Sequence, residues 1–349
     1  MSVDLIRPDL VGMSTYVASS THGKIRLHIN EVPWAPTEEF PLSLNRYPDL
    51  EPQSHLEQEL AEVYHVAPEE LLLTRSADEG IDFVMRLFLR PGIDSIMQFA
   101  PAFSMYAFYA QLQQAAVISC PLEESDFGLN RELLRQLWKP HCKLIILCSP
   151  NNPTGNLIDL ETVASVCQEF AKRSIVLVDE AYIEFSRAVS ATTLINSFDN
   201  LLVLRTLSKA YGLAGLRLGS VIGSAPLMEA LRGTVPPFTF SSLVLETASH
   251  LLKNKVWVKK TVENIVTFRE KLAAYLKNFS WVEKVYPSEA NFILIKTKHA
   301  QALYAWLEHH DILIRHFAGN PLMQDKLRIT VGDALQNESL CRVLDSFRP

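Results

Sequence analysis

Three short polar clusters in the middle of the sequence carry side chains that could do chemistry. They contain an amide at Asn152, a carboxylate at Asp179 with a phenol at Tyr182, and an amine at Lys209. Each cluster directly follows an apolar run that is typical of a strand. Ligands of an open parallel sheet bind beyond the carboxyl ends of the strands. We therefore expect these side chains to meet in one site.

This combination of groups suits a pyridine ring that carries an aldehyde, a phenolate and a phosphate. The amine of Lys209 would form a Schiff base with the aldehyde, and Asp179 would keep the ring nitrogen protonated so that the ring accepts electrons. Asn152 and Tyr182 would donate hydrogen bonds to the ring oxygen. The sequence therefore predicts pyridoxal 5'-phosphate (PLP) as the cofactor.

The phosphate of such a cofactor needs its own donors, and a turn at residues 76–78 (SAD) is placed to supply them. This turn precedes a predicted helix, and the backbone amides and positive dipole end of a helix N-terminus suit an anion. Thr206, Ser208 and Arg217 would complete the phosphate site, with Arg217 as the charge-assisted contact.

Each of these features also has an ordinary structural explanation when it stands alone. The run NNPTG at residues 151–155 is a good turn sequence, and an acidic pair such as Asp179 and Glu180 is common at the start of a helix. Lys209 and Arg217 could be solvated surface residues. Their occurrence in this order, at consecutive strand ends, favours a cofactor site over independent accidents.

The surrounding elements form an alternating pattern that could position this site. A proline-rich and acidic stretch at residues 29–52 predicts an arm or connector, followed by a helix at 55–64, a short apolar run at 71–73 and a helix after Ser76. Further strands are predicted at residues 95–98, 115–119, 143–148, 175–178, 201–204 and 216–222. The alternation predicts a mainly parallel sheet with helices on both faces.

The pattern changes near Phe240. One long helical region at residues 242–276 precedes two predicted strands at 291–296 and 326–331, with a helix at 300–309 between them. This order indicates a smaller α+β domain.

The composition is that of an ordinary globular protein. The chain has 349 residues, 48% of them hydrophobic, and a formal net charge of -6, which gives no support for binding to nucleic acid or anionic membranes. No apolar run approaches the ~20 residues of a membrane span. The five cysteines are scattered and odd in number, without the spacing of a metal site. We expect reduced thiols and a soluble cytoplasmic protein.

Several segments together resemble the fold-type-I PLP-dependent aminotransferases and, more narrowly, the histidinol-phosphate aminotransferase family. The resemblance is carried by SPNNPTG from Ser149, VDEAYIEF from Val178, RTLSKAYGLAGLRLG from Arg205, INEVPWAP from Ile29, RYPD from Arg46, TRSADEGID from Thr74, PAFSMY from Pro101 and LRITVG from Leu327. It implies an α/β fold with a mostly parallel seven-stranded sheet sandwiched by helices, plus a smaller α+β domain. The implied boundaries are 41–245 for the large PLP-binding domain, with 1–40 as an N-terminal arm and 246–349 as the small domain.

Residue by residue, the resemblance agrees with the cofactor site and extends it. Phe103 matches a tyrosine that stacks on the ring, so the stacking face is kept without the hydroxyl. Tyr47 matches a tyrosine that reaches the phosphate from the neighbouring subunit, which implies a homodimer. Ser76 stands where the family more often has glycine. The other matches are Lys209, Asp179 and Tyr182 as catalytic residues, Asn152 at the ring oxygen, and Ala77, Asp78, Thr206, Ser208 and Arg217 at the phosphate.

The resemblance also implies a substrate site. Asn30 and Glu31 match a pair that folds over the active site, and Tyr16 matches a tyrosine near the substrate phosphate. Arg328 matches an arginine that grips a substrate carboxylate, and Arg315 a phosphate contact, although Arg315 could instead form an exposed salt bridge. The implied reaction transfers the amino group of L-histidinol phosphate to 2-oxoglutarate, giving imidazole-acetol phosphate and L-glutamate in L-histidine biosynthesis.

Other functions fit parts of the same pattern. An aromatic amino acid aminotransferase or a threonine-phosphate decarboxylase could use nearly the same residues. A PLP-binding sensor domain of a transcription regulator is disfavoured because the sequence has no helix-turn-helix of its own. An NAD-dependent enzyme is disfavoured because no Gly-x-Gly-x-x-Gly follows a strand near the start.

Overall fold

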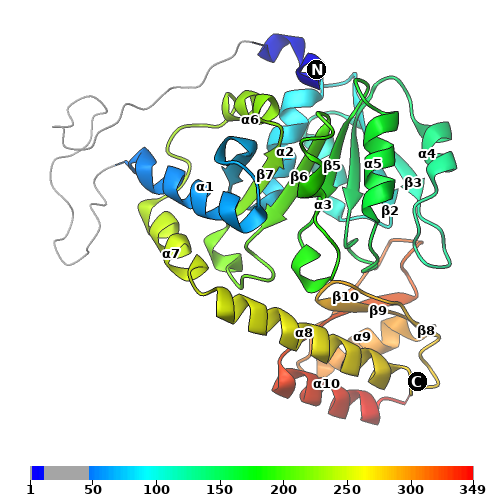
Figure 1. The fold of residues 1–349 in the computed structure, drawn as a ribbon. Coiled ribbons are helices and arrows are strands. Elements are labelled where there is room, and N and C mark those ends of the chain that lie inside the picture. The colour runs from blue at the N-terminus through cyan, green and yellow to red at the C-terminus, as the bar shows by residue number, and fades with distance from the viewer. Residues whose placement is uncertain (1, 12–46, 349) are drawn as a thin grey trace.

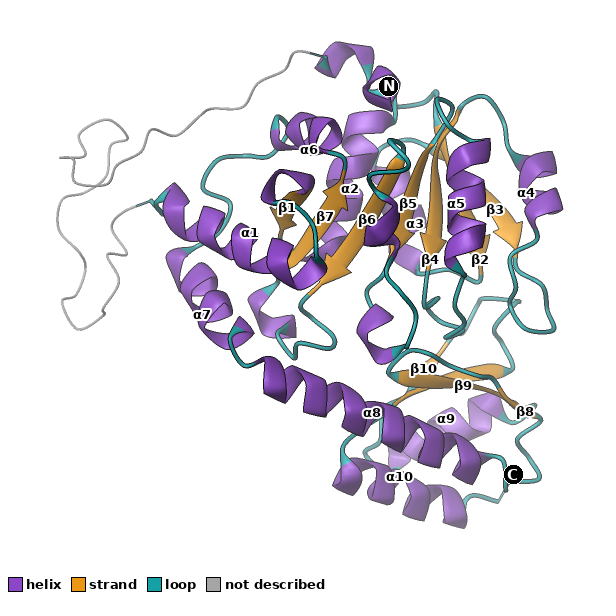
Figure 2. Cartoon of the chain, in the orientation of Figure 1, coloured by secondary structure: helices purple, strands orange, loops and turns teal. Residues whose placement is uncertain are grey.

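The computed structural model describes residues 2–11 and 47–348 (Figure 1). Predictions on Tyr16, Asn30 and Glu31, and most of the proline-rich stretch, lie outside the described residues. The described part of the chain contains a large sheet of seven strands and a small sheet of four (Figure 2). No helix of this part combines the length and the apolar character that crossing a membrane requires.

The large sheet is mostly parallel. Its strands are β1 (Leu71–Thr74), β2 (Ser95–Ala100), β3 (Ala116–Pro121), β4 (Cys142–Cys148), β5 (Ile175–Asp179), β6 (Leu201–Thr206) and β7 (Gly219–Gly223). They lie in the order β1-β7-β6-β5-β4-β2-β3, and only β7 runs antiparallel to its two neighbours. The predicted mostly parallel seven-stranded sheet is confirmed.

Helices cover both faces of this sheet because both sides of its central strands are apolar. On β5, Val176 and Val178 face one layer of helices, and Ile175 and Leu177 face the other. The first layer contains α1 (Leu50–Tyr64), α4 (Arg131–Leu137), α5 (Leu160–Glu169) and α7 (Ser242–Leu252). The second contains α2 (Ser76–Phe88), α3 (Ser104–Leu112) and α6 (Ala225–Arg232).

The small sheet is antiparallel, in the order β10-β11-β9-β8, and has helices on one face. Leu327 and Ile329 pack against these helices, so by the alternation of a strand Arg328 faces the other way. The elements are β8 (Lys284–Val285), β9 (Phe292–Lys296), β10 (Arg315–His316), β11 (Lys326–Thr330), α8 (Lys255–Leu276), α9 (Ala300–His309) and α10 (Ala334–Ser346).

Several elements differ from the sequence prediction. The expected single helical region at 242–276 is two helices, because Asn254 accepts a hydrogen bond from the Trp257 backbone N–H and caps a new helix start. Strand β7 begins at Gly219 instead of residue 216, because Arg217 has left-handed backbone dihedrals (φ 54°). The two-residue strands β8 and β10 were not predicted, since a pair of residues carries no periodic pattern.

Candidate active site

A cavity of about 540 Å³ lies at the carboxyl ends of β4, β5 and β6, with the small sheet on its other side. Residues from all three predicted polar clusters line it. The predicted site residues on its wall are Ala77, Asp78, Phe103, Asn152, Asp179, Tyr182, Thr206, Ser208, Lys209, Arg217, Arg315 and Arg328. Tyr47 does not line this cavity.

Asp179, the last residue of β5, is a buried carboxylate with both oxygens hydrogen-bonded. The hydroxyl of Tyr106 donates to Oδ2 over 2.6 Å, and the backbone N–H of Ala181 donates to Oδ1 over 3.0 Å. Burial raises the pKa of Asp179, and the Tyr106 hydrogen bond opposes that shift. Sequence reasoning missed Tyr106. Its position three residues after Phe103 in PAFSMY, one helical turn away, was the available signal.

Lys209 follows β6 and extends its amine into the cavity. The turn that carries it is held by the Ser208 backbone N–H, which donates to Thr206 Oγ1 over 3.1 Å. The amine lies 5.6 Å from the centre of the Tyr182 ring. The surrounding protein lowers the pKa of Lys209, first by restricting its contact with water and then through the positive charge of Arg328. The amine therefore becomes an unprotonated nucleophile and base at lower pH than an ordinary lysine.

Asn152, Tyr182 and Arg328 line the same cavity and are joined by hydrogen bonds. Asn152 Nδ2 donates to the Tyr182 hydroxyl over 3.4 Å, and Arg328 Nη1 donates to Asn152 Oδ1. The guanidinium lies over the Phe292 ring, 5.1 Å from its centre, a cation–π contact that stabilises the charge. This group joins the loop after β4 to strand β11, so the small sheet takes part in the site.

Two arginines of the small sheet face each other across neighbouring strands at the cavity. Arg315 and Arg328 are paired in the register of β10 and β11. Burial lowers the pKa of Arg328, and the charge of Arg315 contributes to the same shift. Neither arginine forms an ion pair with a carboxylate of residues 2–11 or 47–348. Two such cations side by side suit an anionic substrate group.

The turn at the start of α2 has the geometry for which glycine is usually needed. Ser76 adopts φ 71°, in the left-handed region, and its hydroxyl accepts a hydrogen bond from the Asp78 backbone N–H over 3.3 Å. Arg217 Nη2 donates to the Ser76 hydroxyl over 2.9 Å and lies 3.2 Å from Asp78 Oδ2. Ser76 thus adopts a backbone conformation that favours glycine, and its hydroxyl makes contacts that a glycine would lack.

Gly219 lets β7 approach this turn closely. A Cβ built on Gly219 would lie 2.7 Å from the backbone N of Ala77 and 2.8 Å from the carbonyl oxygen of Arg205. Both are backbone atoms, so moving them would distort the turn and the end of β6. The glycine is therefore what allows the helix N-terminus and the end of β6 to share one wall of the cavity.

The wall beside this turn has the donors that a dianion needs. The hydroxyl oxygen of Ser208 is buried and has no hydrogen-bond partner among the described residues, although Ser208 lines the cavity. A buried polar atom without a partner is rare in folded proteins and points to a missing ligand. Together with the N-terminus of α2 and Arg217, it fits the phosphate of PLP.

Three further residues of the cavity were missed from the sequence. Phe317, Ala318 and Asn320 line it from the loop after β10. This loop has no strand or helix periodicity, and only the pairing of β10 with β11 brings it to the site.

The chain is similar in sequence and in fold to known proteins. The family model for aminotransferase class I and II matches residues 37–344. The histidinol-phosphate aminotransferase 1 of Legionella pneumophila subsp. pneumophila (strain Philadelphia 1) is 45% identical over 346 residues, covering 99% of this chain and 95% of the relative.

Two solved structures share the fold at lower identity. The histidinol-phosphate aminotransferase from Sinorhizobium meliloti, in complex with pyridoxal-5'-phosphate, matches with a TM-score of 0.78 and 23% identity, covering 86% of this chain and 83% of that one. The L-threonine-O-3-phosphate decarboxylase from Porphyromonas gingivalis matches with a TM-score of 0.73 and 22% identity, covering 86% and 90%. These two structures share a fold but differ in reaction. From the family match and the full-length relative, the chain belongs to the class I and II aminotransferases.

Proposed function

We propose that this chain is a PLP-dependent aminotransferase that converts L-histidinol phosphate and 2-oxoglutarate into imidazole-acetol phosphate and L-glutamate, in L-histidine biosynthesis. The observation that carries the proposal is one cavity that holds the Lys209 amine, the Asp179 carboxylate and two arginines without carboxylate partners among the described residues. The relative that is 45% identical over 99% of the chain supports this choice of substrate.

The residues around the cavity fit PLP, which supplies an electron sink that stabilises the carbanion formed at the substrate's amino-bearing carbon. Lys209 would hold the aldehyde and Asp179 the ring nitrogen. Asn152 and Tyr182 would hold the ring oxygen, and Phe103 would cover a face of the ring. The phosphate would be held by Ala77, Asp78, Thr206, Ser208 and Arg217.

Lys209 is the residue placed to move protons. Because the pKa of its amine is lowered, Lys209 can accept the proton that leaves the substrate carbon and return it later as a general acid. Asp179, whose two carboxylate oxygens both accept hydrogen bonds, would supply the negative charge that pairs with the ring nitrogen of PLP. The chain's residues thus supply the base and the counter-charge of the reaction.

Arg328 and Arg315 would bind the anionic groups of the substrates. L-Histidinol phosphate offers a phosphate and 2-oxoglutarate offers carboxylates, so the same two cations can bind each substrate in turn. A site that alternates between two substrates in this way predicts ping-pong kinetics. The roles of Tyr16, Asn30 and Glu31 remain predictions from the sequence.

The test is single-turnover spectroscopy on the PLP-loaded protein. We expect L-histidinol phosphate to convert bound PLP rapidly to pyridoxamine phosphate and 2-oxoglutarate to reverse the change. The variant Lys209→Ala should still bind PLP without a covalent bond and lose turnover by at least about 10²-fold. Normal turnover in that variant would contradict the assigned base. A faster response to L-phenylalanine, or CO2 release from phosphothreonine, would instead identify an aromatic aminotransferase or a decarboxylase.

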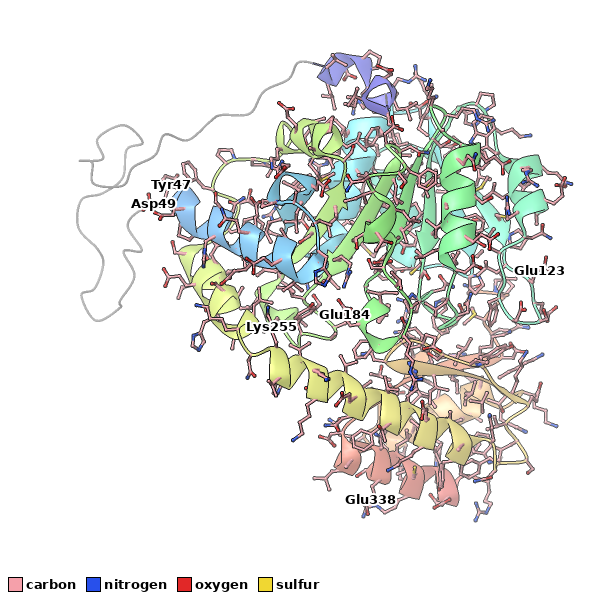
Figure 3. All side chains as sticks on the ribbon, in the orientation of Figure 1. Tyr47, Asp49, Glu123, Glu184, Lys255 and Glu338 are labelled. Atoms are coloured by element: carbon pink, nitrogen blue, oxygen red, sulfur yellow. The ribbon has the colours of Figure 1, made fainter. Side chains whose placement is uncertain are left out.

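We further propose that the active unit is a homodimer in which Tyr47 completes the phosphate site of the partner. Tyr47 is 49% exposed, stacks on Phe238 with 4.7 Å between ring centres, and lies just before the start of α1 (Figure 3). Such a position suits a contact with a second copy better than a contact with its own cavity.

We also propose that the protein is cytoplasmic. The chain would divide into a large domain at 41–245, an arm at 1–40 and a small domain at 246–349.

A further inference from the structure

Tyr106 is a buried residue of α3 that does not line the active-site cavity but touches a residue that does. Its hydroxyl donates to Asp179 Oδ2 over 2.6 Å, and the two side chains are 1% and 4% exposed. Burial, with the nearby charge of Asp179, raises the pKa of Tyr106 well above its ordinary value. Tyr106 therefore keeps its proton and acts as a hydrogen-bond donor to the carboxylate.

We propose that Tyr106 is a positioning residue that keeps Asp179 ionised and correctly oriented, so that this carboxylate can pair with the protonated ring nitrogen of PLP. This inference rests on the proposed function, which makes the ring nitrogen of PLP the partner of Asp179.

The ionised form of Asp179 is costly because the carboxylate is buried. A carboxylate that is 4% exposed loses most of its hydration, and burial raises its pKa. The Tyr106 hydrogen bond is the first opposing influence, while Asp78 adds to the rise and Lys209 acts against it. Without the Tyr106 hydroxyl, Oδ2 loses this donor and the neutral acid is favoured. A neutral acid cannot form a charge pair with the ring nitrogen.

The start of α3 holds Tyr106 beside the cavity wall. Phe103, on the cavity wall, packs edge-on against Tyr106 with 5.6 Å between ring centres and 85° between ring planes. One turn of chain at the start of α3 therefore places both a ring that covers the cavity and the donor that orients Asp179.

The test compares Tyr106→Phe with the unmodified protein for two ligands of the cofactor-free chain. One ligand is PLP, and the other is 1-deazapyridoxal 5'-phosphate, which keeps the aldehyde, the phenol and the phosphate but has C–H in place of the ring nitrogen. Loss of a charge-assisted hydrogen bond should weaken PLP binding by about tenfold to a hundredfold, measured by equilibrium dialysis. Binding of the deaza analogue should change by less than about twofold, because it makes no charge pair with Asp179.

Tyr64→Phe is the matched control. Tyr64 is also buried, at 3% exposure, but its hydroxyl has no hydrogen-bond partner within the described residues. This variant should bind both ligands as the unmodified protein does. In an Asp179→Asn background, Tyr106→Phe should have no further effect on PLP binding.

Equal weakening for both ligands would mean that Tyr106 only supports packing, and unchanged binding of PLP would mean that it does not support Asp179. Either result overturns the inference. If Tyr106→Phe does not fold, Tyr106→His, which can still donate, must retain the preference for PLP over the analogue. Failure of the unmodified protein to bind PLP would instead overturn the proposed function.

Discussion

At the level of single residues, the proposed function gives Arg328 a double role, because its charge would act on both the substrate and the proposed base, Lys209. Arg328 is half-buried, donates to Asn152 and has no carboxylate partner in the described part of the chain. Its positive charge also lowers the pKa of Lys209. An anion that binds Arg328 would screen that charge, so substrate binding and the protonation of Lys209 are coupled.

We predict that Arg328→Gln changes both properties. Loss of the cation should lower kcat/KM for L-histidinol phosphate by about tenfold to a hundredfold, mainly through KM. It should also raise the pKa of Lys209, so that acylation of this lysine in the cofactor-free protein, followed by peptide mass spectrometry, begins at higher pH.

The control for this prediction is Arg342→Gln, which removes an exposed arginine of α10 whose side chain donates to Ser339 over 3.2 Å. This variant should show neither change. A lower KM in Arg328→Gln, or an unshifted labelling profile of Lys209, would contradict the prediction.

At the level of elements, the site depends on how closely β7 and the start of α2 approach each other. Gly219 makes this possible, since a Cβ there would collide with backbone atoms of both neighbours. Ser76 supplies the left-handed turn and Arg217 ties the turn to the segment before β7. Backbone geometry, more than side-chain charge, therefore shapes the wall assigned to the phosphate.

We predict that Gly219→Ala opens this wall. Overpacking against fixed backbone should lower the free energy of unfolding by about 1–3 kcal/mol and weaken PLP binding as well. Thermal unfolding and PLP titration of the cofactor-free protein measure the two effects. Gly215→Ala is the control, because a Cβ at Gly215 meets nothing within 4 Å. Equal behaviour of the two variants would show that the close approach does not matter.

The elements also show what could and could not be predicted from the sequence. Strands β4, β5 and β6 were predicted within two residues because each is a continuous apolar run ending in a polar cluster. Their adjacency in the sheet then brought Asn152, Asp179 and Lys209 to one cavity. The break before α8 depends on a single capping residue, Asn254, inside a helical pattern and was missed.

Contacts between distant segments were the other part that local patterns could not reveal. The hydrogen bond from Tyr106 to Asp179 joins residues 73 positions apart, and that from Arg328 to Asn152 joins residues 176 apart. The resemblance assigned Arg328 to a substrate carboxylate, but only the folded chain shows that its side chain also donates to Asn152.

At the level of the whole molecule, the cavity exists because the small sheet is held against the large one. Arg269 of α8 is buried and donates to the carbonyl oxygens of Phe185, over 3.2 Å, and Ala290, over 2.9 Å. The Glu289 backbone N–H donates to the carbonyl oxygen of Gly155 over 2.8 Å, beside the loop that carries Asn152. These contacts fix the strand of Arg328 relative to the strand ends that carry Asp179 and Lys209.

In the proposed homodimer, each active site would be completed by Tyr47 of the second copy. Mixing two weakly active variants tests this arrangement. Lys209→Ala lacks the base and Tyr47→Ala lacks the proposed phosphate contact, so each should be weakly active alone. If Tyr47 acts across the interface, a mixed dimer contains one site with both residues intact. Random pairing makes about half of the dimers mixed, each with one intact site of two, so mixing should restore about a quarter of the activity of the unmodified protein. If Tyr47 acts within its own chain, no mixed dimer has an intact site, and activity stays at the level of the separate variants.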